Sequence, residues 1–300
     1  MIRFEEFGKS YGPRAAVTSL TCSVEMGEAV ALLGPNGSGK TTTLKGAAGL
    51  IRPTTGRVRI GEPPRDARLP DARRTISYLP QKVAFPEALT GREVLEFYRA
   101  LRGAAPGRVP DVLKFASLNG ASNRGIGSYS GGMVQRLGLA VALLPDAPIL
   151  LLDEPTAALD PDGLCAFYGL VEKRRSEGHT VLFTSHQLGD VERLADRLLL
   201  LVEGRLVASL TQGELAERLA ERGVMRLRLD RPVPGLLATI RPVAPRATWA
   251  GEELVVPGPA KDRPRVLDLV RESGASIVNL VASEGRLDVL YRELVSEDRP

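Results

Sequence analysis

Residues 34–41 read Gly34-Pro35-Asn36-Gly37-Ser38-Gly39-Lys40-Thr41, which fits the pattern G-x-x-x-x-G-K-[S/T]. The stretch follows the apolar run Ala29–Leu33 and opens a helical pattern that extends from Lys40 to Leu50. Glycines let the backbone wrap closely around a phosphate group, and the start of a helix adds its partial positive charge. The sequence therefore predicts a phosphate-binding loop between a buried strand and a helix.

Two side chains of this loop have a predicted chemical role. The Lys40 ammonium can reach the β- and γ-phosphates of a bound nucleotide, and the Thr41 hydroxyl can ligate Mg²⁺. We therefore expect ATP with Mg²⁺ at this loop. The predicted nucleotide contacts are Gly34, Pro35, Asn36, Gly37, Ser38, Gly39, Lys40, Thr41 and Thr42.

A second apolar run, Ile149–Leu152, ends in the two carboxylates Asp153 and Glu154. A buried parallel strand presents its carboxyl end at the ligand crevice. We expect Asp153 on the Mg²⁺ side and Glu154 as the residue that orients or deprotonates the attacking water. Alone, such a strand end is common and often only solvated. The phosphate loop upstream favours the catalytic interpretation.

A third motif, Ser130-Gly131-Gly132-Met133, precedes an amphipathic helical pattern. Ser130 is a plausible helix N-cap, and two glycines at a helix start leave N–H groups open to an anion. The alternative is a capped core helix with no ligand. A second phosphate cradle in one chain is explained if both cradles bind the same nucleotide.

The stretch Tyr129–Met133 resembles the signature motif of ABC ATPases, and its place between the phosphate loop and Asp153 matches the family order. The resemblance covers about Met1 to Arg222. It implies an α/β P-loop NTPase cassette with a RecA-like core, an antiparallel β subdomain and a helical signature subdomain. It also implies an active ATPase that forms a head-to-tail homodimer, in which Ser130, Gly131 and Gly132 of one protomer close on ATP held by the other.

The remaining family positions are also occupied in this sequence. The resemblance implies that Tyr11 stacks on adenine and that Gln81 touches both Mg²⁺ and the attacking water. It places Asp160 at the dimer seam and His186 against the γ-phosphate as a catalytic residue. Taken alone, a turn tyrosine or a single histidine is more often structural.

Residues 78–85 and 89–95 are similar to the ATPase subunit that serves nitrous-oxide reductase maturation (NosF type), although several such proteins carry an acidic residue where this chain has Gln81. A generic ABC-2-type exporter ATPase is the first alternative. A soluble, non-transport ABC ATPase is the second. The single cassette and the short segment between the phosphate loop and Ser130 disfavour the second alternative.

Composition changes beyond the cassette, and we expect two domains, residues 1–222 and 223–300. The second is predicted to be a small α+β domain. Its clearest elements are a strand at Val224–Leu229, a helix at Arg265–Ser273 and a strand at Ile277–Val281.

Charge and apolar patterning restrict the partners. The net charge of +4 comes from scattered basic residues, so we expect no nucleic-acid binding. Cys22 and Cys165 match no metal spacing. No run approaches the roughly 20 apolar residues of a membrane span, and the start of the chain is not a signal peptide. We expect a cytoplasmic protein, peripheral on the inner face of the cell membrane, that drives an integral-membrane permease through the Gln81 loop and the helical insertion up to about Leu118. The nitrous-oxide interpretation adds a periplasmic partner.

Overall fold

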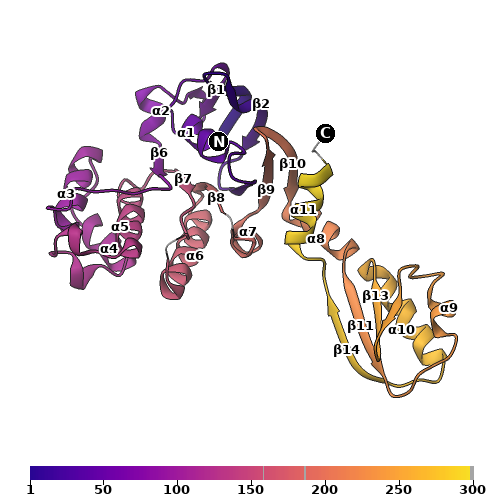
Figure 1. Ribbon diagram of the computed structural model, residues 1–300. Helices are drawn as coiled ribbons and strands as arrows, with labels where there is room; N and C mark the ends of the chain where they lie inside the picture. The colour runs from indigo at the N-terminus through magenta and orange to yellow at the C-terminus, as the bar shows by residue number, and fades with distance from the viewer. Residues whose placement is uncertain (158, 186, 298–300) are drawn as a thin grey trace. The chain divides into compact units, whose positions relative to one another are not determined.

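The structure is a computed structural model that describes residues 1–157, 159–185 and 187–297. The chain divides into two compact units, Met1–Ser209 and Leu210–Pro300 (Figure 1). The domain boundary predicted from composition lies between residues 222 and 223.

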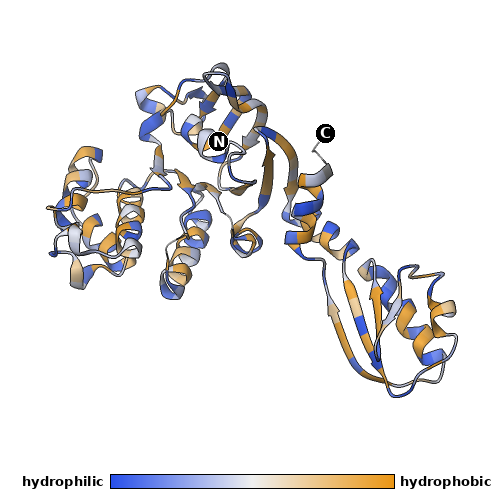
Figure 2. Ribbon diagram, in the orientation of Figure 1, coloured by the Kyte–Doolittle hydropathy of each residue, from blue (hydrophilic) through white to orange (hydrophobic). Residues whose placement is uncertain are grey.

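A six-stranded sheet, in the order β10-β9-β3-β8-β7-β6, forms the centre of the first unit. The pairs among β6, β7, β8, β3 and β9 are parallel. Every residue of β3, β7 and β8 is buried, and so is β9 after its first residue, Arg197; Figure 2 shows the hydrophobic colour of β9. Such uninterrupted apolar strands are typical of a parallel sheet covered on both faces. The strands are β3 (Ala29–Leu33), β6 (Ile76–Leu79), β7 (Ile149–Asp153), β8 (Thr180–Thr184), β9 (Arg197–Val202) and β10 (Arg205–Thr211).

A second, antiparallel sheet shares one core with the first. Its order is β2-β1-β4-β5. Side chains of β1 and β2 pack with helix α1 (Lys40–Ala47) and with the central strands in a single buried cluster that includes Phe7 and Leu44. The phosphate-loop helix therefore lies between the two sheets. The strands are β1 (Ile2–Tyr11), β2 (Arg14–Val24), β4 (Thr55–Ile60) and β5 (Arg65–Asp66).

Helices α3, α4 and α5 pack against one another as a separate layer of the first unit (Figure 1). The first of these begins with a capping box, in which Thr90 and Glu93 each bind the other's backbone N–H. The helices of this unit are α2 (Pro70–Arg74), α3 (Gly91–Arg102), α4 (Arg108–Phe115), α5 (Gly131–Leu143), α6 (Pro161–Ser176) and α7 (Leu188–Leu194), with short 3₁₀ turns at Asn119–Ala121 and Ile126–Ser128.

The second unit contains a four-stranded sheet in the order β12-β13-β11-β14, with α9 and α10 packed on its core face. The order of elements is β-α-β-β-α-β, which is that of ferredoxin-like folds. The predicted strand-helix-strand pattern thus holds for β11, α10 and β14. The elements are α8 (Gln212–Glu221), β11 (Val224–Leu229), α9 (Leu236–Ile240), β12 (Thr248–Ala250), β13 (Glu253–Pro257), η3 (Ala260–Asp262), α10 (Arg263–Glu272), β14 (Ile277–Ser283) and α11 (Leu287–Glu297).

No helix within the described ranges has the length and apolar character that crossing a membrane requires.

Gly46, on the face of α1 that meets β1, offers a test of this packing. A Cβ added there would lie 2.6 Å from Cζ of the fully buried Phe7. We expect Gly46→Ala to lower the free energy of unfolding by about 1–3 kcal/mol, because overpacking outweighs the better helix propensity of alanine. Gly169→Ala is the matched control, since nothing lies within 4 Å of a Cβ at this exposed position of α6. Urea denaturation that finds the two variants equally stable would contradict this packing.

Candidate active site

The phosphate loop turns sharply between β3 and α1. Gly39 has φ 101°, and a Cβ there would lie 2.4 Å from the carbonyl oxygen of Ala16. A Cβ on Gly34 would lie 2.2 Å from the carbonyl oxygen of Leu201. Both positions therefore require glycine, because a side chain has neither the conformation nor the space. The loop is supported from β2 on one side and β9 on the other.

Lys40 is the buried cation of the loop. Its Nζ donates hydrogen bonds to the carbonyl oxygens of Gly34, at 2.8 Å, and Pro35, at 3.1 Å, and the residue is 6% exposed. Burial lowers the pKa of Lys40, while the nearby carboxylates of Glu154 and Asp153 oppose this shift. The ammonium thus lies inside the loop and within electrostatic reach of both predicted acids.

Thr184 joins the two acids. Asp153 ends β7 and pairs with Thr184 at the end of the parallel strand β8. The Thr184 hydroxyl donates to Asp153 Oδ1 at 2.8 Å and accepts the backbone N–H of Glu154 at 2.8 Å. Thr184 was not among the predicted site residues. Its place at the carboxyl end of a neighbouring buried strand was the available signal.

The two carboxylate oxygens of Asp153 differ in their hydrogen bonding. Its Oδ2 is buried and has no hydrogen-bond partner of normal geometry in the described chain. Burial raises the pKa of Asp153, while hydrogen bonds from Thr184 and Thr41 act in the opposite direction. The Thr41 hydroxyl therefore lies near the Asp153 carboxylate. A buried carboxylate oxygen beside a threonine hydroxyl suits a hard cation that prefers oxygen ligands.

Gln81 and Glu154 meet across the edge of the sheet. The Gln81 Nε2 donates to Glu154 Oε2 at 2.8 Å. Glu154 itself has φ +52°, an uncommon conformation for a residue with a side chain. The structure thus brings together the predicted residues of the phosphate loop, Gln81, Asp153 and Glu154.

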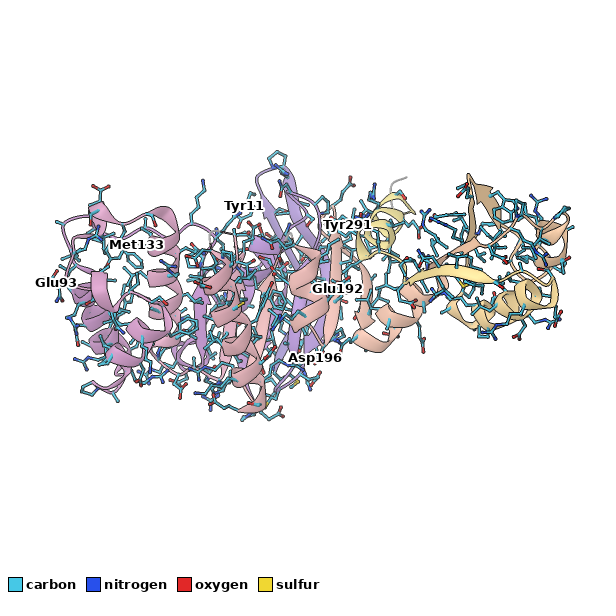
Figure 3. The ribbon with its side chains drawn as sticks, turned by 90° about the horizontal axis from the view of Figure 1, so that it is seen from below. Tyr11, Glu93, Met133, Glu192, Asp196 and Tyr291 are labelled. Atoms are coloured by element: carbon cyan, nitrogen blue, oxygen red, sulfur yellow. The ribbon has the colours of Figure 1, made fainter. Side chains whose placement is uncertain are left out.

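The signature residues do not join this group within one chain. Ser130 caps α5, and its Oγ accepts the N–H of Met133 at 3.3 Å. In the described parts of the chain Ser130 makes no hydrogen bond to the phosphate loop, and Figure 3 shows Met133 well apart from Tyr11. Farther along α5, Arg136 donates to Asp160 Oδ2 at 2.8 Å.

Tyr11, Asp160 and His186 are the remaining predicted site residues. The side chain of Tyr11 is 51% exposed at the end of β1, and Lys9 Nζ lies 5.1 Å from its ring centroid. Asp160 is the N-cap of α6 and accepts the N–H of Gly163. His186 lies outside the described residues, as does Ala158 beside the Asp160 turn.

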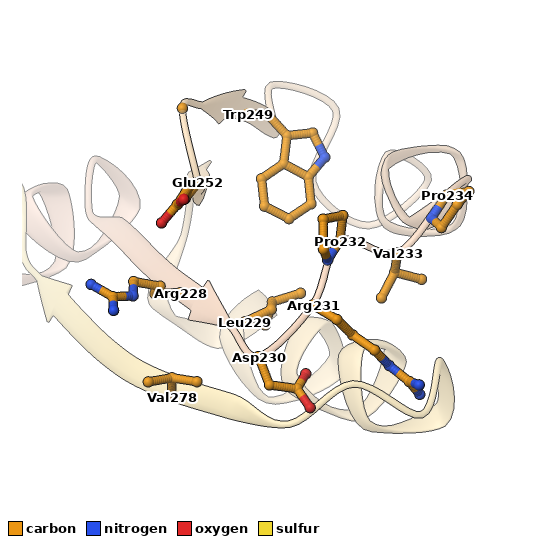
Figure 4. A pocket seen from close by; sticks show the side chains of 11 residues that line it. Arg228, Leu229, Asp230, Arg231, Pro232, Val233, Pro234, Trp249, Glu252 and Val278 are labelled. Carbon is orange, nitrogen blue, oxygen red and sulfur yellow. The ribbon is translucent and has the colours of Figure 1, made fainter.

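The second unit holds a cavity of its own. It has a volume of about 580 Å³ and lies where β11 ends and β14 begins (Figure 4). Trp249, Pro232 and Val278 supply apolar walls, and Arg228 and Glu252 supply opposite charges. None of the predicted site residues lines this cavity.

The burial of Asp153 leads to a test by pH. Folding raises the pKa of this carboxyl group. Its contribution to the stability of the folded protein is therefore lost as the pH rises from the unfolded pKa through the folded pKa. We therefore expect Asp153→Asn, without nucleotide or metal, to raise the melting temperature at neutral pH and to change it little at acidic pH where both states are protonated. Asp268→Asn, at an exposed position of α10, is the control. A destabilised Asp153→Asn at neutral pH would contradict this account.

Comparison with known proteins places this chain in a family. Residues 17–157 match the ABC transporter family. The uncharacterised ABC transporter ATP-binding protein YxlF of Bacillus subtilis (strain 168) is 42% identical over 223 residues, 72% of each chain. The linearmycin resistance ATP-binding protein LnrL of the same organism is 30% identical over 304 residues, 98% of each chain.

Solved structures agree with the sequence relatives. A dimeric ATP-binding cassette in a post-hydrolysis state, bound to ADP and phosphate, superposes with a TM-score of 0.65 at 28% identity and covers 71% of this chain and 99% of that chain. The α/β cassette fold predicted from the sequence is thereby confirmed. With its phosphate loop and paired acids at one sheet edge, this chain belongs to the ABC transporter family and is an ATP-binding, ATP-hydrolysing subunit of that family.

Proposed function

We propose that this chain is the motor subunit of an ABC exporter, in which two copies close around ATP and separate after hydrolysis. The observation that carries the proposal is the convergence of Lys40, Asp153, Glu154 and Gln81 at the carboxyl ends of adjacent parallel strands. Phosphoryl transfer needs little covalent chemistry from the protein and depends on positioning and charge stabilisation. This arrangement of one cation and three oxygen-bearing side chains suits both needs.

Each residue has a proposed role. The loop Gly34–Thr42 would bind the phosphates through its N–H groups, and Lys40 would leave its carbonyl partners to meet the β- and γ-phosphates. Thr41, Asp153 and Gln81 would hold Mg²⁺, which when bound offsets the negative charge of the phosphates. Glu154 would orient or deprotonate the attacking water. In this proposal Gln81 exchanges its bond to Glu154 for contacts to the metal and the water.

The other half of the site would come from a second copy. The start of α5 is available for this role, because Ser130 and Gly131 are exposed and nothing lies within 4 Å of a Cβ at Gly131. Helix N-termini bind anions through their free N–H groups. The ion pair between Arg136 and Asp160 links this helix to the turn proposed for the dimer seam. The dimeric state of the solved relative supports the same arrangement. His186 and Tyr11 would contact the γ-phosphate and adenine.

The dimer can be tested with a variant that binds but does not hydrolyse. Glu154→Gln keeps the size of the side chain and one acceptor oxygen, and it removes the negative charge and the basicity. We expect this variant to form a stable dimer with ATP and Mg²⁺, measured by size-exclusion chromatography with light scattering. Lys40→Ala is the control, and it should bind no nucleotide in a fluorescence titration and stay monomeric. A Glu154→Gln variant that binds ATP yet stays monomeric would contradict the proposal.

A groove lined by residues that follow α1 and by residues of β6 suits the proposed permease. The cavity, of about 620 Å³, is lined by the exposed side chains of Leu50 and Leu101 and by Tyr78, Arg73 and Arg102. Tyr78 belongs to β6, the strand that leads directly into Gln81. Its apolar and basic side chains suit a short amphipathic helix with acidic residues from the cytoplasmic side of an integral-membrane permease. If such a helix moved, it would displace β6 and with it Gln81.

Leu101→Asp tests this groove. Leu101 is 66% exposed, so the change should leave folding and basal ATPase activity intact. We expect it to reduce co-purification with a co-expressed permease, sought among the products of neighbouring genes. Met26→Asp is the matched control, because Met26 is 62% exposed and lies outside the groove. Equal recovery of the membrane protein by both variants would exclude this docking site.

The direction of transport and the transported substrate are proposed from the relatives and from the sequence. The relative named for linearmycin resistance is similar along almost the whole chain, which favours an exporter as the proposal. The nitrous-oxide maturation role, with a periplasmic partner, stays a prediction that rests on residues 78–85 and 89–95. Genes for a six-helix membrane protein and a periplasmic repeat protein beside this one would favour that role. In either case we propose a peripheral position on the cytoplasmic face of the membrane.

A further inference from the structure

Asp190 is a buried carboxylate in the first turn of α7. It is 1% exposed, and it forms no ion pair with any described residue. Three hydroxyl groups donate to it instead. Thr156 Oγ1 and Ser185 Oγ reach Oδ2 at 2.7 and 2.6 Å, and the Tyr168 hydroxyl reaches Oδ1 at 2.6 Å. Burial, and then the bond to Asp190, raise the pKa of Tyr168 to about 12, so this phenol keeps the proton that it donates.

The three donors come from different segments of the fold. Thr156 follows Glu154 by two residues, Ser185 directly follows Thr184, and Tyr168 lies on α6. Asp190 therefore ties the segment after β7 to the segment after β8. These are the same two strand ends that Thr184 joins through its hydroxyl.

The segment between these two sets of hydrogen bonds contains Glu154. Its backbone has φ +52°, a conformation that persists only where the surroundings enforce it. On one side the Thr184 hydroxyl accepts the N–H of Glu154 at 2.8 Å. On the other side Asp190 holds Thr156, and Pro155 between them has a fixed φ. The strained residue is thus fixed from both directions.

We propose that Asp190 is a positioning residue for hydrolysis, which holds Thr156 and Ser185 so that the carboxylate of Glu154 stays aligned with the attacking water. This inference rests on the proposed role of Glu154. Asp190 itself would touch neither ATP nor water.

A merely structural role for Asp190 leads to a different expectation. A core hydrogen-bond acceptor that only stabilises the fold would lower the melting temperature and the fraction of active molecules. Turnover per nucleotide-binding molecule would then be normal. A positioning role lowers kcat in molecules that bind nucleotide fully, and it leaves KM unchanged because the binding groups are intact.

The experiment compares Asp190→Asn with Glu192→Gln in the full-length chain. Both changes replace a carboxylate by an amide on α7, but Glu192 is exposed and labelled on that helix in Figure 3. We expect Asp190→Asn to lower kcat by about ten- to a hundredfold, the loss typical of a misplaced catalytic group. The KM for ATP and the stoichiometry of a fluorescent ATP analogue should stay within about twofold of wild type. Glu192→Gln should match wild type.

Thr156→Val provides a second variant if Asp190→Asn does not fold. It removes one donor and keeps the carboxylate, and it should lower kcat less than Asp190→Asn does. The double variant should lose less activity than the product of the single losses, since both changes act through the same bond. Normal kcat in Asp190→Asn or in Thr156→Val, or a rise in KM alone, would overturn the inference. A wild-type chain without ATPase activity would instead contradict the proposed function.

Discussion

The register of the hydrogen bonds between β7 and β8 sets the positions of Asp153, Glu154 and Thr184 in the candidate active site. It sets Asp153 opposite Thr184, so that one hydroxyl binds both the carboxylate of Asp153 and the backbone N–H of Glu154. A shift of one residue would turn these side chains to the opposite face of the sheet. Because every residue of both strands is buried, packing on both faces resists such a shift. The geometry of the site thus depends on an apolar interior.

The parts of the site that follow from short-range pattern could be predicted from the sequence. The phosphate loop needs glycines, a strand before it and a helix after it, and all of these are adjacent in the chain. The acids Asp153 and Glu154 could be placed in the same way, because they end an apolar run. Likewise Ser130 could be recognised as a helix cap, which the structure bears out.

Contacts between distant segments could not be derived in this way. Gln81 and Glu154 are far apart in sequence, and their hydrogen bond exists because β6 and β7 are parallel neighbours. The same holds for Asp190, which looks like an ordinary polar residue of an amphipathic helix until α7 is packed. In the second unit, Pro and Gly near residues 232–259 obscure β12 and β13, whose pairing with β11 depends on tertiary contacts.

The close approach of Gly46 to Phe7 has a consequence for the phosphate loop. Because α1 has no side chain there, the helix that follows the loop sits directly against β1. A bulkier residue at position 46 would shift the whole helix, and the loop at its start would move with it although none of its own residues had changed.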